Sequence, residues 1–297
     1  MSKLSHQANP LLGQGPTYPI KAELVQATNA LSALSPSARL DAELLLSKII
    51  HQSRTFFYTH PEYTLTLLEH KAYQHLLAQR MTGTPIAYLT GTREFWSLPL
   101  EVTTDTLIPR PDTERLVELT LSLLPETFPA KILDLGTGSG AIALALASER
   151  PNWSLLACDK SQAAVQTARD NATRLSINNM NVLCSNWFDS IPKQRFDAIV
   201  SNPPYIAEND PHLLQGDVRF EPRDALVSGV DGLDALHYII EQSQDWLLPK
   251  GFIVLEHGFE QGPAVTAALK RFGYQHVKCF QDWQENDRVS IGQAKSK

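Results

Sequence analysis

The sequence predicts an α/β protein in which a small helical domain precedes a doubly wound parallel sheet. From Lys131 onward, strand-like apolar runs alternate with helical ones, which is typical of a parallel sheet with helices on both faces. Before that point, residues 21–81 show only helical patterns. A chain of 297 residues is long enough for both parts.

Composition and charge narrow the class of protein. Apolar residues make up 43% of the chain and charged residues 20%, which predicts a globular protein with a sizeable core. The net charge of −6 disfavours a nonspecific nucleic-acid binder. Cys158, Cys184 and Cys279 are scattered and odd in number, which excludes a disulfide framework and fits a reducing compartment. No apolar stretch approaches membrane-spanning length, so we expect a cytoplasmic protein.

The chain is expected to divide into four segments. Residues 1–19, rich in glycine and proline, predict a flexible leader. Residues 20–88 predict the helical domain, where Ser35 and Pro36 resemble an N-cap followed by the first residue of a helix. Residues 89–110 hold short β-prone runs broken by proline, which indicates a hairpin linker. Residues 111–297 form the sheet domain, which should end in an antiparallel pair of strands, "HVKCFQD" and "RVSIGQA".

A glycine-rich loop, "LDLGTGSGA", stands where the first strand of the sheet passes into the first helix. Gly136, Gly138 and Gly140 allow a ligand to approach the backbone closely at the N-terminus of that helix. Asp159 ends the next strand about 20 residues later, where a carboxylate can accept hydrogen bonds from both hydroxyls of a ribose. The loop therefore indicates a cofactor containing adenosine, without distinguishing NAD from S-adenosylmethionine.

A second motif, "VSNPPYI", follows two strand–helix units of about 30 residues each further along the chain. This spacing places it at the end of the fourth strand, which lies beside the first in a doubly wound sheet. Asn202 offers a side-chain oxygen and Pro203 a carbonyl, while the prolines keep the backbone stiff and free of N–H donors. Such an edge suits a substrate that carries an NH₂ group on a planar carbon, because the two oxygens can accept hydrogen bonds from its two N–H groups. Tyr205 can pack on that flat group.

The chemistry expected from the two motifs is direct transfer of a methyl group from a sulfonium donor to a planar nitrogen. Positioning dominates such a displacement and supplies up to ~7–11 kcal/mol of the barrier. The reaction needs neither a metal ion nor a covalent nucleophile, and we assign no metal ligands in this sequence.

Several stretches together resemble the HemK/PrmC family, the glutamine N5-methyltransferases that act on peptide chain release factors. The resemblance extends from about Ser35 to Gln293. The stretches that carry it are "GTREFWSLPLEV", "TLIPRPDTE", "LDLGTGSGAIALALA", "IVSNPPYI" and "DVRFEPRDALVSGVDGL".

The resemblance implies a class I S-adenosylmethionine-dependent methyltransferase fold with a small N-terminal helical domain for substrate recognition. It also implies that the side-chain amide of the glutamine in the Gly-Gly-Gln loop of class I release factors is methylated, a step in translation termination. Carried onto this chain, it implies S-adenosylmethionine contacts at Gly136, Thr137, Gly138, Ser139, Gly140, Asp159, Trp187 and Asn202. It places substrate contacts at Asn202, Pro203, Pro204 and Tyr205, with Asn202, Pro203 and Tyr205 as the catalytic residues.

Other interpretations stay open at this stage. A DNA or RNA adenine N6-methyltransferase also uses an asparagine- or aspartate-proline-proline-aromatic motif, although the acidic charge speaks against it. A nucleotide-dependent oxidoreductase would use the glycine loop but leaves "NPPY" unexplained, and the intact site argues against a non-catalytic binding module.

The sequence does not settle the roles of four further residues. Arg110 and Glu114 would either reach the cofactor or fix the linker. Glu256 and His257 end the fifth strand near the expected crevice. Asn186 stands where the resemblance predicts an aspartate, so we expect weaker cofactor binding at most.

Overall fold

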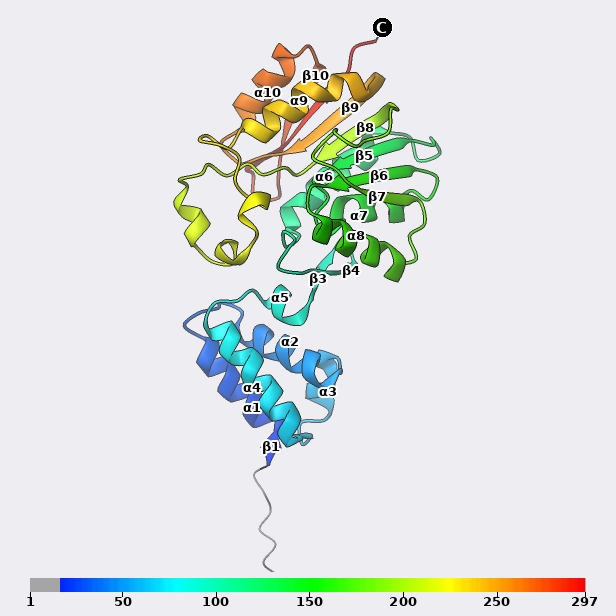
Figure 1. Ribbon diagram of the computed structural model, residues 1–297. Helices are drawn as coiled ribbons and strands as arrows, with labels where there is room; N and C mark the ends of the chain where they lie inside the picture. Colours follow the sequence, from blue (N-terminus) through cyan, green and yellow to red (C-terminus); the bar gives the residue numbers. More distant parts are fainter. Residues whose placement is uncertain (1–16, 297) are drawn as a thin grey trace, which may run out of the picture. The chain divides into compact units, whose positions relative to one another are not determined.

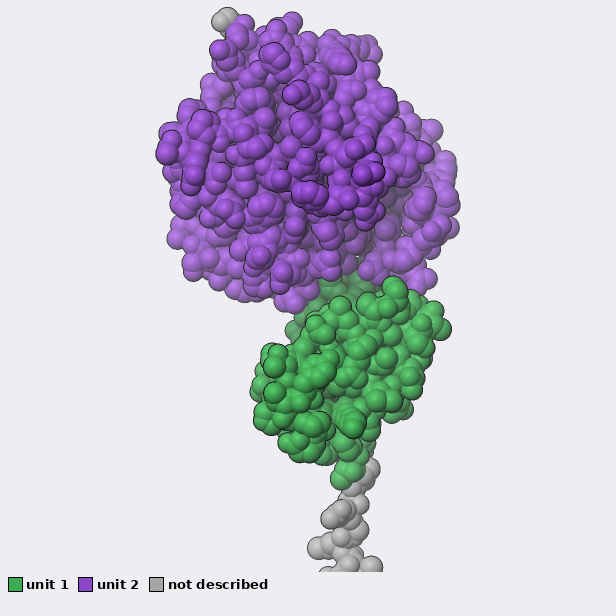
Figure 2. All heavy atoms as spheres, turned by 180° about the vertical axis from the view of Figure 1, so that it is seen from behind, with its two compact units in different colours: residues 1–90 green, residues 91–297 purple. Residues whose placement is uncertain are grey.

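The computed structural model describes residues 17–296. Within them the chain forms two compact units, one ending at Thr90 and the other beginning at Gly91 (Figure 2). Most of the predicted leader lies outside the described residues, but its last two residues, Tyr18 and Pro19, form a short strand. None of the described helices is both long and apolar enough to cross a membrane.

The first unit is a small bundle of helices around its own apolar core, which includes Leu24, Leu45 and Tyr73. A charged group lies inside it, because the fully buried Glu43 accepts hydrogen bonds from Arg39, Arg54 and Tyr58. The elements are β1 (Tyr18–Pro19), α1 (Ile20–Leu31), α2 (Ala38–Ile50), α3 (Arg54–Thr59), β2 (Thr64–Leu65), α4 (Leu67–Met81) and α5 (Ile86–Thr90).

Two details of this unit differ from the sequence prediction. The second helix begins at Ala38, so the N-cap predicted at Ser35 was wrong by two residues. The Ser35 hydroxyl instead accepts a hydrogen bond from the backbone N–H of Ser37 within a turn, a local competitor of helix capping. The strands β1 and β2 also pair antiparallel, and stretches of two residues are too short to show a period in a sequence.

The second unit opens with a β-hairpin and continues into a mixed sheet of seven strands (Figure 1). The hairpin turns at Trp96 and Ser97, whose φ angles of 52° and 58° match the tight turn that follows the twist of paired strands. Its elements are β3 (Thr92–Phe95), β4 (Leu98–Glu101), η1 (Pro111–Thr113), α6 (Glu114–Leu123), β5 (Lys131–Leu135), α7 (Ala141–Glu149), β6 (Ser154–Asp159), α8 (Gln162–Arg174), β7 (Met180–Cys184), β8 (Phe196–Ser201), η2 (Pro211–Leu214), η3 (Val218–Phe220), η4 (Arg223–Ala225), α9 (Asp234–Trp246), β9 (Leu247–Glu256), α10 (Gly262–Arg271), β10 (Gln275–Gln281) and β11 (Asp287–Gln293).

The strand order is β10-β11-β9-β8-β5-β6-β7. The strand β8, fourth along the chain in this sheet, pairs in parallel with β5, which confirms the prediction that the motif after it lies beside the glycine loop. The predicted antiparallel closing pair is confirmed as β10 and β11. The direction in which successive strands are added to the sheet reverses between β5 and β8. In parallel sheets, ligands bind at such a switch point, outside the carboxyl ends of the strands.

Helices cover both faces of the sheet, as the alternating sequence predicted. On one face α6, α7 and α8 bury residues such as Leu116, Leu144 and Val165 against the strands. On the other face α9 and α10 bury Ile240 and Leu269. Layers packed on both sides hold the strand ends, and the loops that leave them, in fixed positions.

Candidate functional site

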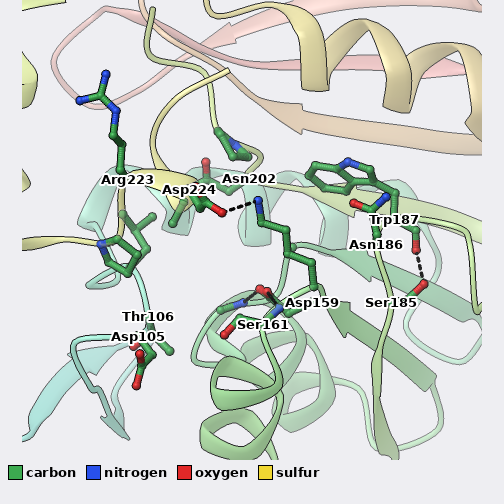
Figure 3. A pocket seen from close by; sticks show the side chains of 17 residues that line it. Asp105, Thr106, Asp159, Ser161, Ser185, Asn186, Trp187, Asn202, Arg223 and Asp224 are labelled. Atoms are coloured by element: carbon green, nitrogen blue, oxygen red, sulfur yellow. Dashed lines mark hydrogen bonds and ion pairs between the residues drawn. The ribbon is translucent and has the colours of Figure 1, made fainter. Parts of the chain in front are cut away.

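A cavity of about 570 Å³ opens at the carboxyl ends of β5, β6 and β8 (Figure 3). Its volume falls within the range of small-molecule sites, about 300–1,000 Å³. Its lining comes from the glycine loop, the ends of two neighbouring strands, the motif after β8 and two further loops. These residues are Asp105, Thr106, Leu107, Gly136, Gly138, Asp159, Lys160, Ser161, Ser185, Asn186, Trp187, Asn202, Pro204, Pro222, Arg223, Asp224 and Ala225.

The glycine loop presents its backbone to the cavity at Gly138. The φ angle of this residue is 56°, and a Cβ there would meet no atom within 4 Å, so the space beside this backbone is open to a ligand. At Gly140, glycine is required for packing and not for access by a ligand. A Cβ at this position would lie 3.0 Å from Leu144 and 3.2 Å from Ala168, so glycine allows the loop to pack closely on two helices.

Two members of the loop face inward. The Thr137 hydroxyl donates a 2.6 Å hydrogen bond to Asp134, whose pKa is raised to about 7 by complete burial. Ser139 is buried, and its carbonyl accepts a hydrogen bond from the Asn171 side chain. Thr137, Ser139 and Gly140 therefore support the loop and do not line the cavity, whereas Gly136 and Gly138 do.

Asp159 lies at the end of β6 with its carboxylate in the cavity (Figure 3). Its Oδ2 accepts a hydrogen bond of 2.9 Å from the backbone N–H of Gly138, and its Oδ1 accepts one of 2.9 Å from Ser161. Each carboxylate oxygen has a second acceptor site, so both can still receive hydroxyl hydrogens from a ligand.

Trp187 forms a wall of the cavity beside the glycine loop. Its carbonyl accepts hydrogen bonds from the Ser185 hydroxyl and the Cys158 thiol, which hold its backbone at an unfavourable φ of 51°. A Cβ at Gly136 would lie only 3.5 Å from the indole ring, so the ring packs over the loop. Asn186 lines the cavity too, but its side-chain amide donates to Asp189.

The cavity fits an adenosine-bearing cofactor on three observations from this chain. The backbone at Gly138 borders open space, Asp159 keeps free acceptor capacity, and the Trp187 ring offers an apolar face for a flat base. Gly136, Gly138, Asp159 and Trp187 are the residues that would hold such a group. The sequence predicted contacts with S-adenosylmethionine at these four residues, and the structure places all four in the lining of the cavity.

The residues of the Asn-Pro-Pro-Tyr stretch face in different directions. Asn202 and Pro204 line the cavity, whereas Pro203 is buried behind it. The Asn202 Nδ2 donates a hydrogen bond of 3.2 Å to the hydroxyl of Thr113, which leaves the side-chain oxygen as the group available to a ligand. The Tyr205 hydroxyl points away from the cavity and donates to Glu256 Oε1 at 3.2 Å.

Glu256 is completely buried at the end of β9, and burial raises its pKa to about 7 against the opposing effects of the nearby Thr113 side chain, the charge of Arg288 and the hydrogen bond from Tyr205. His257 is also buried and shares a 2.8 Å hydrogen bond with the Ser290 hydroxyl. Burial lowers the pKa of His257, which keeps the ring neutral at physiological pH. Neither side chain lines the cavity.

The structure supports the structural interpretation of Arg110 and Glu114. Arg110 donates to the buried Glu221 at 2.6 Å, and Glu114 accepts a hydrogen bond from the backbone N–H of Trp96 in the hairpin turn. Neither residue lines the cavity. Both fix the segment between the hairpin and α6.

The sequence interpretation missed two loops that complete the cavity. One contains residues 105–107, just before the "IPRPDTE" stretch, and the other contains residues 222–225. Lys160 and Asp224 form a 3.1 Å ion pair that joins the end of β6 to the second loop (Figure 3). The position of "RFEPRDAL" so soon after "NPPY" was the available signal, because loops at this sheet edge face the ligand.

Comparisons with known proteins agree with this geometry. A family model described as the PrmC N-terminal domain matches residues 24–91, and one described as the methyltransferase small domain matches residues 115–216. The release factor glutamine methyltransferase of Escherichia coli is 52% identical over 269 residues, which cover 91% of this chain and 96% of that protein. The one of Shewanella oneidensis is 50% identical over 262 residues, covering 88% of this chain and 91% of that protein.

A solved structure adds support for the fold. A methyltransferase from Pyrococcus furiosus superposes with a TM-score of 0.52 at 18% identity, covering 75% of this chain and all of that one. The class I methyltransferase fold expected from the sequence is thereby confirmed. With half of its residues identical to those of two relatives over most of its length, this chain belongs to the release factor glutamine methyltransferase family.

Proposed function

We propose that this protein transfers a methyl group from S-adenosylmethionine to the side-chain amide nitrogen of a glutamine in peptide chain release factors. We further propose that the glutamine is the one in the Gly-Gly-Gln loop of class I factors. The names of the relatives support the substrate. We infer a cytoplasmic enzyme from this substrate and from the free thiols of Cys158, Cys184 and Cys279.

The single observation that carries the chemistry is the orientation of Asn202. Its Nδ2 donates to Thr113, which leaves its oxygen available in the cavity that Gly138, Asp159 and Trp187 also line. A primary amide needs such an acceptor, because resonance with the carbonyl withdraws its lone pair. A hydrogen bond from the amide N–H to the Asn202 oxygen favours positive charge on that nitrogen as the new bond forms.

The role of each residue follows from this geometry. S-adenosylmethionine supplies an electrophilic methyl group when it is bound. Asp159 and Trp187 hold its nucleoside end, while the rigid proline backbone beside Asn202 fixes where the acceptor nitrogen can lie. As the nitrogen gains the methyl group, the carbon–sulfur bond breaks with its electron pair left on sulfur. The nitrogen gives up one proton to water, so the product amide is neutral. We assign substrate contacts to the side chains of Asn202 and Pro204, to the backbone carbonyl of Pro203, whose ring is buried, and to the ring of Tyr205 rather than its hydroxyl.

Transfer of a labelled methyl group tests this proposal. The enzyme is incubated with S-adenosylmethionine labelled on the methyl group and with a class I release factor. Matched reactions contain the same factor with the loop glutamine changed to alanine, or duplex DNA. We expect label in the native factor only. Equal labelling of the altered factor would place the target elsewhere, and labelling of the DNA would favour the adenine N6-methyltransferase alternative.

A further inference from the structure

A buried polar cluster lies directly behind the Asn-Pro-Pro-Tyr stretch, on the side away from the cavity. Thr113 comes from the end of η1, Glu256 from the end of β9, and Arg288 from β11. Thr113 is 4% exposed and Glu256 is 1% exposed, so this is a desolvated site in which each polar contact has a large effect. None of the three lines the cavity.

The cluster holds two members of the stretch from behind. The Thr113 hydroxyl accepts the Nδ2 hydrogen of Asn202 at 3.2 Å, and Glu256 accepts the hydroxyl hydrogen of Tyr205 at 3.2 Å. Between residues 17 and 296, the Asn202 side chain forms no hydrogen bond other than the one to Thr113. Thr113 is therefore the group that decides which end of the Asn202 amide faces the cavity.

Glu256 and Arg288 form the charged part of this cluster. The Thr113 and Tyr205 side chains both lie beside the Glu256 carboxyl, and Tyr205 donates to its Oε1. The charge of Arg288 favours the ionised carboxyl, and Arg288 is itself held by Asp282 at 3.2 Å and Asp112 at 3.7 Å. The cluster thus holds the stretch through two separate hydrogen bonds, one from Asn202 to Thr113 and one from Tyr205 to Glu256.

Resting on the proposed function, we infer that Thr113 and Glu256 are positioning residues. They form a buried anchor that fixes the Asn202 amide with its oxygen toward the acceptor nitrogen and holds the Tyr205 ring by its hydroxyl. Without the Thr113 hydroxyl, the Asn202 amide loses the contact that distinguishes its oxygen from its nitrogen. An amide turned by half a rotation would present N–H donors to the N–H groups of the substrate.

The variants Thr113→Val and Thr113→Ser test the anchor, because valine keeps the shape without the hydroxyl and serine keeps the hydroxyl. We expect Thr113→Val to lower kcat by about 10- to 100-fold, the usual effect of losing a supporting contact behind a functional group. Thr113→Ser should recover kcat to within about threefold of the native value. The affinity for S-adenosylmethionine in calorimetry should be unchanged in both variants, because Thr113 does not line the cavity.

A matched control comes from the helix that follows Thr113. Thr120 is fully buried in α6, and its hydroxyl donates to the backbone carbonyl of Leu116, away from the cavity. Thr120→Val should lower the melting temperature without a comparable loss of kcat. Equal losses of kcat in Thr113→Val and Thr120→Val, or in Thr113→Val and Thr113→Ser, would show a purely structural role and overturn the inference.

A crystallographic comparison separates failure of the anchor from failure of the proposed function. In Thr113→Val the Asn202 amide should turn or take two orientations, while in Thr113→Ser it should stay as in the native protein. A native enzyme that does not label release factor would refute the proposed function, and the Asn202 orientation would still decide the anchor. An Asn202 side chain that is unmoved in Thr113→Val would overturn the anchor even if the enzyme methylates release factor.

Discussion

Asn202 belongs to the Asn-Pro-Pro-Tyr stretch, lines the cavity and donates a hydrogen bond to Thr113 of the buried anchor. Replacing it with alanine removes the acceptor oxygen and leaves the rest of the cavity intact. We expect Asn202→Ala to lower kcat by about 10²- to 10³-fold, as for the loss of one preorganised polar contact to a reacting group. Methyl transfer at saturating concentrations of both substrates measures this. Turnover within a few-fold of the native enzyme would refute the role assigned to the oxygen.

The Asp159 carboxylate accepts hydrogen bonds from the backbone N–H groups of Gly138 and Ser161, and we expect it to accept hydrogen bonds from the cofactor as well. We expect Asp159→Ala to weaken binding of S-adenosylmethionine by at least about tenfold, because charged hydrogen bonds contribute about 1.5–3 kcal/mol each. Isothermal titration calorimetry measures the change. Asp170→Ala is the matched control, since Asp170 is an exposed carboxylate on α8 that does not line the cavity. Unchanged affinity in Asp159→Ala would reject the ribose assignment.

At this scale the sequence predicted which residues gather but not how each is oriented. Gly138, Asp159, Trp187 and Asn202 were expected at the site and do line the cavity. Tyr205 was expected there too, yet its hydroxyl turns to Glu256. The reason is physical: a buried carboxyl more than fifty positions away provides the partner, and no local pattern encodes that distance.

At the scale of elements, the pair Arg110–Glu221 ties the segment before η1 to the loop of residues 222–225. The Glu221 side chain is fully buried, and burial raises its pKa to about 7 against the charge of Arg110. We expect Arg110→Ala to destabilise the fold by about 2–3 kcal/mol, because it leaves a buried carboxylate without its partner. Urea unfolding measures this cost.

The cost of Arg110→Ala should depend on pH. It should be larger at pH 8 than at pH 6, since Glu221 is mostly neutral below its pKa and then needs no partner. The double variant Arg110→Ala/Glu221→Gln serves as the control and should recover most of the loss at pH 8. A cost that does not change with pH would contradict this account.

The alternating strands and helices of the sheet were predictable because each element repeats its own period over many residues. The loops at its carboxyl edge were not. Residues 222–225 reach the cavity because Arg110 and Glu221, distant in the sequence, hold the start of that loop. A long-range ion pair leaves no periodic signal in either segment.

For the molecule as a whole, the buried Glu256 makes the stability depend on pH. Its pKa is about 7 in the folded state and 4.5 as an ordinary glutamate, so the folded state holds this proton more tightly. The stabilising contribution is complete below pH 4.5 and is lost as the pH rises through about 7. Glu256→Gln removes this dependence.

We therefore expect the stability of Glu256→Gln, relative to the native protein, to rise by about 2–3 kcal/mol between pH 5 and pH 8. Urea unfolding at several pH values gives the difference directly. Glu260→Gln, a change on the surface close by, is the control and should leave the slope unaltered. A constant difference between Glu256→Gln and the native protein would mean that the carboxyl stays ionised throughout.

The ion pair between Lys160 and Asp224 bears on how quickly the methyl donor is captured. Both side chains are more than half exposed, so the attraction is weak, at most about 1 kcal/mol, and dissolved ions screen it. An ion pair this weak breaks and re-forms often by thermal motion alone. Raising the salt concentration would loosen it further, so cofactor uptake in stopped-flow measurements should become slightly faster. A preformed, water-filled entrance would show no such acceleration.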